Sequence, residues 1–481
     1  MKRRKFTHDV IVIGGGAAGQ AAATGCAKFG LKTALVEAEH MGGDGLYYGC
    51  VPSRTLLYSA SILHNARELS QKYNFPSIND KAPSISGLKN KVQSVIETLK
   101  ERNDPSWFRK QGIEVYLENA RFTDEDRIYL DSGSILTAPN FVFAAGSLPD
   151  IPPIDGLRQS QYLTSRNIFT LSSVPAHMII LGGGPVGTET AQIMNFLGSK
   201  ITIIEKEPHV LPGEDGDMAD ILEKKMRADG INVLTCTKVT QIEEESGKKN
   251  VMCTEGNETH TISGDAVFVA LGRKGRAEDA SIKSAGIEAE NGFLPTDNTL
   301  RTEKSHIYAC GDANGMGFTT HIAEAEGAFA AWQITFNKKA KFQYKYIPRC
   351  IYTDPEIASV GMNEKMAAEN GINFKIHTAS FASNPRAVTE DASEGQLKLI
   401  LNKKDIIIGA EITARRAGEL IMPAVYAVRE GWKIDTFFHP IYPYPTLSGI
   451  YKTAAEDYLS PVFSSGGGKR PRRLFRRLFR F

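Results

Sequence analysis

Two glycine-rich turns have the spacing of a loop that binds the diphosphate of a dinucleotide. In each, a short apolar run leads into the pattern G-x-G-x-x-G, and a stretch of helical character follows. The glycines let the backbone turn sharply and approach a pyrophosphate, whose charge is stabilised by the N-terminus of the helix. The turn glycines are Gly14, Gly16 and Gly19 in the first unit and Gly182, Gly184 and Gly187 in the second.

An acidic residue follows each turn at the same distance. Glu37 ends an apolar run 23 positions after Gly14, and Glu205 does so 23 positions after Gly182. A carboxylate at this point accepts a hydrogen bond from a ribose hydroxyl. A single motif of this kind is weak evidence, because glycine turns also occur in ordinary βαβ units. Two complete strand–turn–helix–strand–acid units with equal spacing predict two dinucleotide sites.

The acid of the second unit also bears on which dinucleotide binds there. A carboxylate at Glu205 accepts from the 2′-hydroxyl of NADH and repels the 2′-phosphate of NADPH. Lys206 and His209 follow closely and weaken this preference. We therefore expect NADH, with NADPH as the alternative.

Four further stretches resemble the FAD-dependent pyridine nucleotide–disulfide oxidoreductases, the family of dihydrolipoamide dehydrogenase, glutathione reductase and mercuric reductase. Residues 141–147 (FVFAAGS) resemble the family's ATG strand, and residues 267–273 (VFVALGR) resemble its second copy. Residues 307–312 (IYACGD) resemble the return FAD motif, and residues 352–361 (YTDPEIASVG) the entry to the dimerisation domain. The resemblance keeps the family order from about residue 8 to about residue 459.

The resemblance implies an α/β fold with two doubly wound, Rossmann-like dinucleotide-binding domains and an α+β C-terminal dimerisation domain, hence a homodimer. It implies FAD at the first turn and NADH at the second. Asp312 would bind the flavin ribitol, although a helix N-cap is also compatible with its position. The implied cofactor-binding residues are Gly14, Gly16, Gly19, Glu37, Gly43, Ala145, Gly146, Gly311, Asp312, Gly182, Gly184, Gly187, Glu205 and Gly272.

The family order also gives the expected domains. Residues 1–150 form the first part of the FAD domain, 151–275 the NAD(H) domain, 276–346 the return segment of the FAD domain, 347–459 the dimerisation domain, and 460–481 a flexible linker with a basic amphipathic tail. Residues from about 60 to 110 are expected to be helical, as is the stretch from Ala417 to Glu430.

The run around Cys50 departs from the family. The family carries a Cys-x4-Cys disulfide above the flavin, and here Gly45 stands at its first cysteine while Cys50 stands at the second. The lysine expected beside the flavin is Arg54, and its glutamate partner matches Glu189, so we expect an Arg54–Glu189 ion pair. Cys50 opens a helix expected from Val51 to about Leu69. The Cys50 thiolate can tune the potential of the flavin, or cycle through a sulfenic acid or a mixed disulfide. The alternative is that Cys50 is only a packing residue.

The far end of the implied site is altered as well. The family's H-P-T-x-x-E supplies a histidine base and its carboxylate across the dimer, and here Tyr444 and Gly449 stand at those positions. A tyrosine hydroxyl holds its proton at neutral pH and is a poor base. His439 is close in sequence but out of register, and is read either as a surface histidine or as a substitute base.

Thiol exchange needs an attacking thiolate, a resolving thiol and a proton acceptor. Because these are incomplete here, disulfide reduction by the family mechanism is not expected. Mercury reduction is not expected either, since no cysteine follows Cys350. The leading hypothesis is an FAD-dependent NADH oxidoreductase with a small-molecule electron acceptor such as a quinone, oxygen or a redox carrier. The alternatives are a non-catalytic flavoprotein scaffold docked through its tail, and residual disulfide reduction by Cys50 with an external thiol. The expected catalytic residues are Cys50, Arg54, Glu189 and Tyr444.

The cysteine pattern predicts a location in the reducing cytoplasm. No apolar run approaches the roughly 18–20 residues that span a bilayer. Two observations argue against an export signal at the N-terminus. Asp9 interrupts the apolar stretch, and that stretch is itself the expected first strand of the FAD site. The cysteines lack the spacing of a disulfide framework, and Cys310 is expected to be buried. They are Cys26, Cys50, Cys236, Cys253, Cys310 and Cys350.

Basic charge is concentrated at the two ends of the chain. Residues 2–5 carry four positive charges and residues 469–481 carry seven with no acid, so the remaining body is acidic although the net charge is +2. After a Ser/Gly linker (464–468), four apolar residues of the tail would share one helical face opposite arginines. Such a tail adsorbs to an anionic membrane or an acidic partner, or else stays a solvated tail. Nothing in the body indicates sequence-specific nucleic-acid binding. The apolar tail residues are Leu474, Phe475, Leu478 and Phe479.

Overall fold

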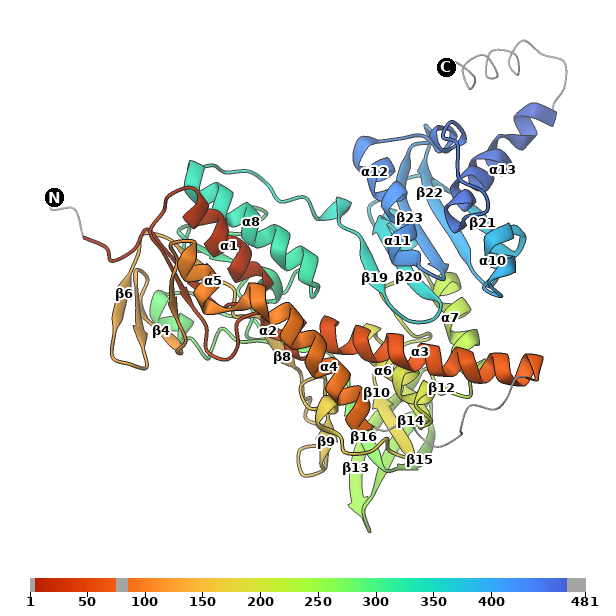
Figure 1. The fold of residues 1–481 in the computed structure, drawn as a ribbon, viewed down its shortest axis with the longest axis horizontal. Coiled ribbons are helices and arrows are strands. Elements are labelled where there is room, and N and C mark those ends of the chain that lie inside the picture. Colours follow the sequence, from red (N-terminus) through yellow and green to blue (C-terminus); the bar gives the residue numbers. More distant parts are fainter. Residues whose placement is uncertain (1–4, 75–84, 465–481) are drawn as a thin grey trace.

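Two parallel sheets and one antiparallel sheet form the main layers of the protein (Figure 1). The structure is a computed structural model that describes residues 5–74 and 85–464. The two parallel sheets carry the two glycine turns, and the antiparallel sheet forms the C-terminal part. This arrangement confirms the expected α/β class with two Rossmann-like domains and an α+β C-terminal domain.

The first parallel sheet carries the first glycine turn and has the strand order β18-β7-β1-β2-β3. Strand β1 is buried throughout, as its unbroken apolar run indicates. Helices α1 and α8 cover one face, and the meander β4–β5–β6 covers the other. The bounds are β1 (Val10–Ile13), β2 (Thr33–Val36), β3 (Glu114–Tyr116), β4 (Ala120–Asp124), β5 (Arg127–Leu130), β6 (Ile135–Thr137), β7 (Phe141–Phe143), β18 (Ile307–Ala309), α1 (Ala17–Lys28) and α8 (Thr320–Phe336).

The second parallel sheet repeats the plan with the order β12-β11-β10-β16-β9, and an antiparallel meander β13–β14–β15 packs beside it. The two passages of chain between the parallel-sheet domains pair with each other as strands β8 and β17. The bounds are β8 (Ser147–Pro149), β9 (Tyr162–Leu163), β10 (His177–Leu181), β11 (Lys200–Ile204), β12 (Asn232–Leu234), β13 (Thr237–Glu245), β14 (Lys248–Glu255), β15 (Glu258–Gly264), β16 (Ala266–Val269), β17 (Arg273–Gly275), α6 (Pro185–Phe196) and α7 (Gly216–Ala228).

The C-terminal part is an antiparallel sheet, β19-β20-β23-β22-β21, packed with helices. The helix expected from Ala417 to Glu430 is interrupted at Ile421, because Pro423 stands in the first turn of a new helix and cannot continue the previous one. The bounds are β19 (Arg349–Ile351), β20 (Glu356–Gly361), β21 (Phe374–Ser380), β22 (Gln396–Asn402), β23 (Ile407–Ala414), α9 (Glu364–Glu369), α10 (Pro385–Thr389), α11 (Ala417–Leu420), α12 (Met422–Glu430) and α13 (Ile450–Ser464).

Helix α13 corrects one expected boundary. It runs to Ser464, so the segment expected to be a linker from residue 460 begins inside a helix. Leu459 is buried against the C-terminal part. The helix continues beyond Leu459 because its hydrogen bonds form between backbone groups of the helix itself. The basic tail, residues 469–481, lies outside the described residues.

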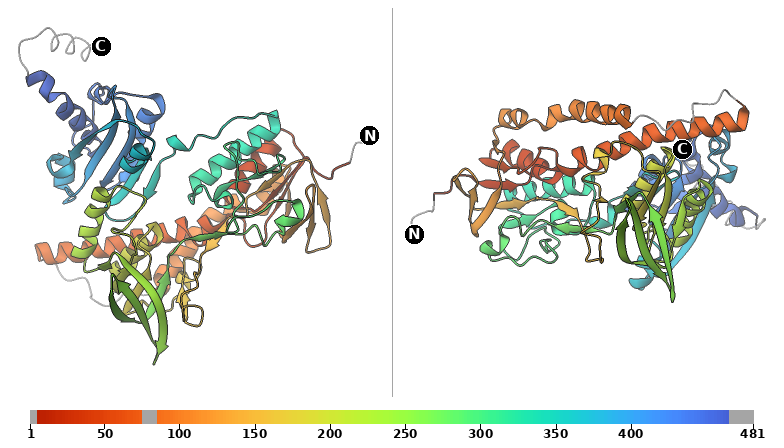
Figure 2. Two further views of the ribbon diagram at one scale, coloured as in Figure 1. Left: turned by 180° about the vertical axis from the view of Figure 1, so that it is seen from behind. Right: turned by 90° about the horizontal axis from the view of Figure 1, so that it is seen from below.

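A helical excursion connects the two parallel-sheet domains. It consists of α2 (Gly43–Tyr47), α3 (Cys50–Tyr73), α4 (Ile85–Lys100) and α5 (Pro105–Lys110), as the expectation for residues 60–110 indicated. Helix α3 starts in the first domain and packs on α6 of the second, with α4 alongside it (Figure 2). Among residues 5–74 and 85–464, no helix combines the length and apolarity required to cross a membrane.

Helices α1 and α8 pack at backbone distance through glycine. A Cβ on Gly327 would lie 2.0 Å from the carbonyl oxygen of Ala18, and a Cβ on Gly25 would lie 2.7 Å from the Cβ of Ala331. The residue before Gly327, the fully buried Glu326, accepts hydrogen bonds from Gly311 N at 2.6 Å and Tyr344 Oη at 2.6 Å. The helix pair therefore fixes the turn that carries the return FAD motif.

Substituting Gly327 with alanine tests the helix contact. The added Cβ would push α8 away from α1, and overpacking of this kind costs about 1–3 kcal/mol. We expect a lower thermal midpoint, by about 2–4 °C per kcal/mol, measured by near-UV circular dichroism. Gly87→Ala on α4 is the matched control, since no atom of residues 5–74 and 85–464 lies within 4 Å of its added Cβ. It should leave the midpoint equal or raise it, and an unchanged midpoint for Gly327→Ala would contradict the packing argument.

Burial raises the pKa of Glu326 from its ordinary value of 4.5 to about 7. Between these values the folded state retains a proton that the unfolded state has released, so stability falls as the pH rises through this window, by at most about 3 kcal/mol. Glu326→Gln preserves the acceptor for Gly311 and can donate to Tyr344. We expect the thermal midpoint of the wild type, but not of this variant, to drop by several degrees between about pH 5 and about pH 8. Equal drops in both proteins would rule out Glu326 as the group.

Candidate functional site

The first glycine turn leaves the N-terminus of α1 open to a ligand. Gly14 has φ +107°, and a Cβ there would lie 2.2 Å from the carbonyl oxygen of Ala144. A Cβ on Gly19 would lie 1.8 Å from the carbonyl oxygen of Gly14. Gly16 is the N-cap of α1, and among the described residues no side chain caps the first N–H groups of the helix. Such N–H groups fit a diphosphate.

The second turn has the same construction. A Cβ on Gly182 would lie 2.5 Å from the carbonyl oxygen of Ala270, and one on Gly187 would lie 2.0 Å from that of Gly182. Gly184 is the N-cap of α6; among the described residues no side chain caps this helix and no atom lies within 4 Å of a Cβ added to Gly184. Both turns therefore fit the diphosphate of a dinucleotide.

Each acid that follows a turn also braces that turn. Glu37 accepts a hydrogen bond from Gly15 N at 2.5 Å, and Glu205 accepts one from Gly183 N at 2.7 Å. In each case the second carboxylate oxygen accepts from the backbone two residues further on, at Glu39 and Glu207. The structure thus gives these carboxylates a loop-fixing role in addition to the expected contact with a ribose.

The other expected flavin residues gather beside the first turn. Gly43 lies against Gly16, where a Cβ would be 2.9 Å from the Gly16 Cα. Asp312 accepts a hydrogen bond from Ser147 Oγ at 2.5 Å and pairs with Arg273 Nε at 3.2 Å. Burial raises the pKa of Asp312. The hydrogen bond from Ser147 and the ion pair with Arg273 hold the Asp312 carboxyl group next to strands β8 and β17.

The remaining expected cofactor residues are three glycines and one alanine. Gly146 and Gly272 have φ of +73° and +129°, and nothing lies within 4 Å of a Cβ added to either. Ala145 is half-buried at the end of strand β7. Gly311 has φ +66°, and its Cβ would meet the Cβ of Ala323 at 3.0 Å. Gly146 and Gly272 therefore leave room for a ligand, whereas Gly311 allows close packing against Ala323.

Sequence reasoning missed an ion-pair network at this edge. Asp44 pairs with Arg166 and Arg273, both at 2.8 Å, and Glu39 pairs with Arg276 at 3.0 Å and with Arg166. Burial would raise the pKa of Glu39, but the two arginines outweigh it and lower the pKa. The signal available in the sequence was the acid inside the run Gly42–Gly45, which stands where the family run has threonine.

Cys50 stands at the N-terminus of α3 with a hydroxyl as its partner. Its Sγ lies 3.3 Å from Thr320 Oγ1, and a Cβ on Gly45 would lie 3.3 Å from the same oxygen. The position of the missing thiol is thus next to the hydroxyl of Thr320, which comes from α8. All six cysteines are free, and Cys310 is buried as expected.

The expected Arg54–Glu189 ion pair is formed, with 2.6 Å between Arg54 Nη1 and Glu189 Oε2. Glu189 also accepts a hydrogen bond from Tyr352 N at 2.9 Å, and the guanidinium stacks on the Tyr352 ring at 3.9 Å. Burial raises the pKa of Tyr352 to about 12. Nothing in the sequence indicated Tyr352 at this site, because its stacking on Arg54 depends on tertiary packing.

Tyr444 lies apart from these residues within one chain. Its side chain is 83% exposed on the C-terminal part, and no hydrogen bond, ion pair or ring contact among the described residues joins it to Cys50, Arg54 or Glu189. Gly449 stands in a short 3₁₀ turn before α13, and His439 is exposed. A contribution of Tyr444 to this site therefore needs a second chain.

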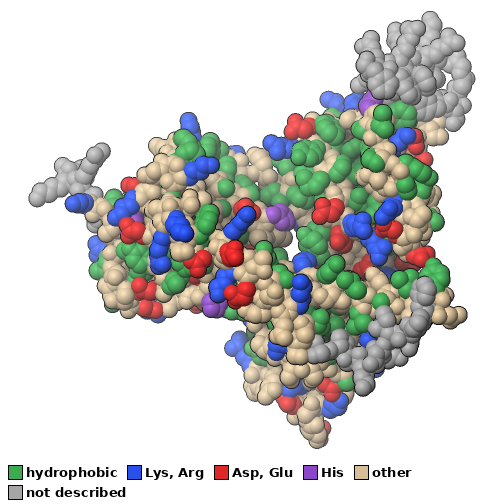
Figure 3. Space-filling model, viewed as in Figure 1, with side chains coloured by type: hydrophobic (Ala, Val, Ile, Leu, Met, Phe, Trp, Pro, Cys, Tyr) green, Lys and Arg blue, Asp and Glu red, His purple; other side chains and the backbone are tan. Residues whose placement is uncertain are grey.

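The C-terminal part offers a surface for such a chain. Hydrophobic side chains gather on the face of it seen in Figure 3. The exposed large apolar side chains of this part include Met422, Tyr426, Ile441 and Tyr444, the last two more than four-fifths exposed. Exposed apolar surface of this kind is typical of a subunit interface.

Comparisons with known proteins agree with this geometry. The family model described as pyridine nucleotide-disulphide oxidoreductase matches residues 8–330, and the model of its dimerisation domain matches residues 347–455. A dihydrolipoyl dehydrogenase of Buchnera aphidicola (subsp. Acyrthosiphon pisum) is 34% identical over 472 residues, covering 95% of this chain and 98% of the relative. A mercuric reductase of Staphylococcus aureus is 27% identical over 456 residues, covering 94% and 82%.

A solved structure extends the likeness to the fold. The HOCl-induced flavoprotein disulfide reductase RclA from Escherichia coli has a TM-score of 0.81 at 24% identity, with 93% of this chain and 99% of that chain covered. The match to the dimerisation domain indicates a homodimer. The chain therefore belongs to the pyridine nucleotide-disulphide oxidoreductase family, whose members are enzymes that use FAD and NAD(P)H.

Proposed function

We propose that this protein is an FAD-dependent NADH oxidoreductase whose electron acceptor is not a disulfide. The observation that carries the proposal is the pairing of Cys50 with Thr320 beside Gly45, where the family has a second thiol. One thiol with a hydroxyl neighbour has no partner with which to close a disulfide. Two further positions support the same conclusion. Tyr444 is exposed and stands where the family has its histidine base, and Gly449 has no carboxylate to orient such a base.

The two nucleotide sites, by contrast, keep their donors. The N-terminus of α1, Glu37 and Asp312 would hold FAD, and the N-terminus of α6 with Glu205 would hold NADH. FAD bound there would supply two-electron transfer from NADH to the acceptor, and the residues of this chain would bind and orient the two nucleotides. This half of the family reaction depends on positioning more than on side-chain chemistry.

Arg54 contributes fixed positive charge to the site. Glu189 and the Tyr352 ring hold its guanidinium, and the Glu189 carboxylate is itself buried. A cation held in place in this way stabilises negative charge that develops nearby without first reorganising. We infer that the pair takes over the role of the lysine–glutamate pair that the family resemblance implies.

NADH is preferred to NADPH in this proposal. The Glu205 carboxyl is buried, accepts a hydrogen bond from Gly183 N, and stands at the position expected to meet the ribose. Lys206 is mostly exposed and pairs with Glu207 at 3.6 Å, and His209 Nδ1 bonds to the carbonyl oxygen of Val210, so neither is committed to a 2′-phosphate.

Two alternatives stand beside this function. The exposure of Cys50 favours residual disulfide reduction with an external thiol such as glutathione. A flavoprotein scaffold would instead use the basic tail to dock on an anionic membrane or acidic partner, and that tail lies outside the described residues.

The decisive experiment is an anaerobic titration of the flavin-loaded protein with NADH. We expect the flavin absorbance to bleach, and Cys50→Ala to retain most of the NADH turnover with quinones as acceptors. Thr320→Ala serves as the control for disturbance of the thiol environment. Absence of bleaching would contradict the enzyme proposal, and loss of quinone turnover in Cys50→Ala would assign the thiol an essential role. Turnover of disulfides that depends on added glutathione would favour the alternative.

Glu205→Ala tests the choice of dinucleotide. Removing the acceptor and the repulsive charge should raise the KM for NADH and lower the ratio of NADH to NADPH specificity by about tenfold, the equivalent of about 1.4 kcal/mol. Steady-state kinetics with both dinucleotides give the ratio. Lys206→Ala should change the ratio by less than about twofold, and an unchanged ratio in Glu205→Ala would contradict the assignment.

A further inference from the structure

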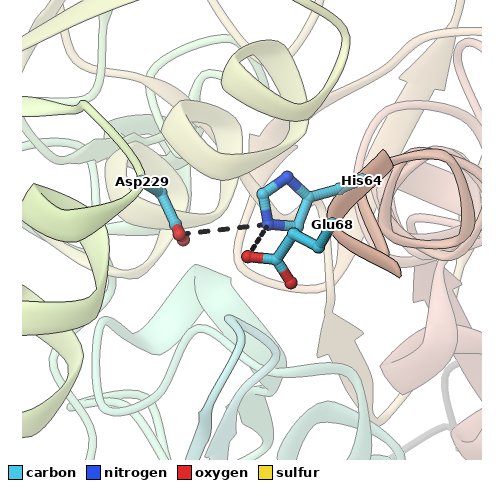
Figure 4. Close-up of side chains that lie close together, drawn as sticks. All are labelled: His64, Glu68 and Asp229. Carbon is cyan, nitrogen blue, oxygen red and sulfur yellow. Dashed lines mark ion pairs between the residues drawn. The ribbon is translucent and has the colours of Figure 1, made fainter. Parts of the chain in front are cut away.

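Three polar side chains meet between helices α3 and α7, away from both glycine turns. His64 and Glu68 come from α3, and Asp229 is the residue that ends α7. Figure 4 shows the three side chains pointing toward one another, with Asp229 across from the other two. Because His64 and Glu68 are four positions apart, they share one face of their helix.

The separations fit a shared cation. His64 Nε2 lies 3.4 Å from Glu68 Oε1 and 3.9 Å from Asp229 Oδ1, and one ligand atom from each residue lies within 4.8 Å of the others. Two ligands about 2.0–2.1 Å from a tetrahedral Zn²⁺ lie about 3.4 Å apart. The three groups therefore need to move by less than about 1 Å to coordinate one ion of that size.

Two atoms of this cluster lack hydrogen bonds. His64 Nε2 and the second carboxylate oxygen of Asp229, Oδ2, are both buried and have no hydrogen-bond partner among the described residues. The Asp229 side chain is only 4% exposed, so water does not readily compensate it. A buried polar atom without a partner costs about 1–3 kcal/mol, and a ligand that binds both atoms would remove that cost.

The imidazole is held in place for coordination. Its ring stacks on the Phe196 ring with 4.1 Å between centroids and 20° between planes, and Phe196 is fully buried at the end of α6. A ligand ring fixed by packing loses little freedom when a metal binds.

The local charge also favours a further cation. Lys225 Nζ lies 2.7 Å from Asp229 Oδ1 and 3.5 Å from Glu68 Oε1, so one ammonium faces two carboxylates. Lys225 bonds to Oδ1, which leaves Oδ2 for a second cation.

A second acidic cluster provides the contrast. Asp215, Asp217 and Glu364 also lie within ligand range of one another, but the buried ammonium of Lys398 contacts all three. The cation of this second cluster is therefore the Lys398 ammonium of the chain itself, and the cluster contains no imidazole.

We propose that His64, Glu68 and Asp229 form a binding site for one divalent transition-metal cation of the Zn²⁺ class. The ion would tie α3, whose first residue is Cys50, to α7 of the second dinucleotide-binding domain. Imidazole and carboxylate are ligands that Zn²⁺ accepts, and solvent reaching the half-exposed Glu68 edge would supply the fourth.

The test is a Zn²⁺ titration of the full-length, flavin-loaded protein in competition with a chromophoric chelator. The exposed thiols Cys50 and Cys236 are first replaced by serine, because thiolates also bind Zn²⁺. We expect one Zn²⁺ per chain. His64→Gln, Glu68→Gln and Asp229→Asn should each weaken binding by at least about tenfold. Glu68→Gln changes a half-exposed side chain and is expected to fold, and Asp217→Asn in the second cluster should leave the affinity unchanged.

Lys225→Gln gives an independent readout of the same site. Removing the competing positive charge should tighten Zn²⁺ binding several-fold, whereas a site elsewhere would not respond. The proposal is overturned if the thiol-free protein binds no stoichiometric Zn²⁺, if Glu68→Gln and Asp229→Asn bind as tightly as their parent, or if Lys225→Gln leaves the affinity unchanged.

Discussion

A buried carboxylate, Glu189, connects the three parts of this protein. It lies on α6 of the second dinucleotide domain, pairs with Arg54 on α3 from the first, and accepts from Tyr352 N at the entry to the C-terminal part. A buried ion pair contributes little to the net free energy of folding, because both charged groups lose their hydration. Removing one partner is costly, however, since it leaves an uncompensated charge. The contact therefore fixes how the domains meet rather than how firmly each one folds.

Around that junction the structure separates two halves of the family's chemistry. The loops for both dinucleotides keep their glycines, their open helix N-termini and their bracing carboxylates. The thiol half is reduced to Cys50 beside the hydroxyl of Thr320. Nucleotide binding depends on backbone geometry, whereas thiol exchange depends on individual side chains. Single substitutions can therefore remove the second function without disturbing the first, which is why we place the acceptor outside the disulfide class.

Helix α3 carries residues of both the redox site and the proposed cation site. It begins at Cys50, presents Arg54 one turn later, and continues to His64 and Glu68 against α7. A cation held at the far end would hold this helix against the second dinucleotide domain. The site proposed there and the redox function rest on different residues, so each stands or falls on its own evidence.

The sequence alone determined the features that depend on short-range backbone geometry. The glycine turns, the acids 23 positions after them and the buried strand β1 follow from local spacing and an unbroken apolar run. The family resemblance added the Arg54–Glu189 pair and the loss of the first thiol at Gly45. Helix ends were less secure, because α13 runs to Ser464 and the 417–430 stretch breaks at Ile421.

Only the tertiary structure decided which distant side chains meet. Thr320 reaches Cys50 from 270 positions away, and Asp44 reaches Arg273 from 229. The same holds for Asp229 and His64, which come from different domains. Such contacts depend on how sheets and helices pack, and no local spacing encodes that packing. The sequence therefore settles where the chain turns, while the fold settles which charges and thiols those turns bring together.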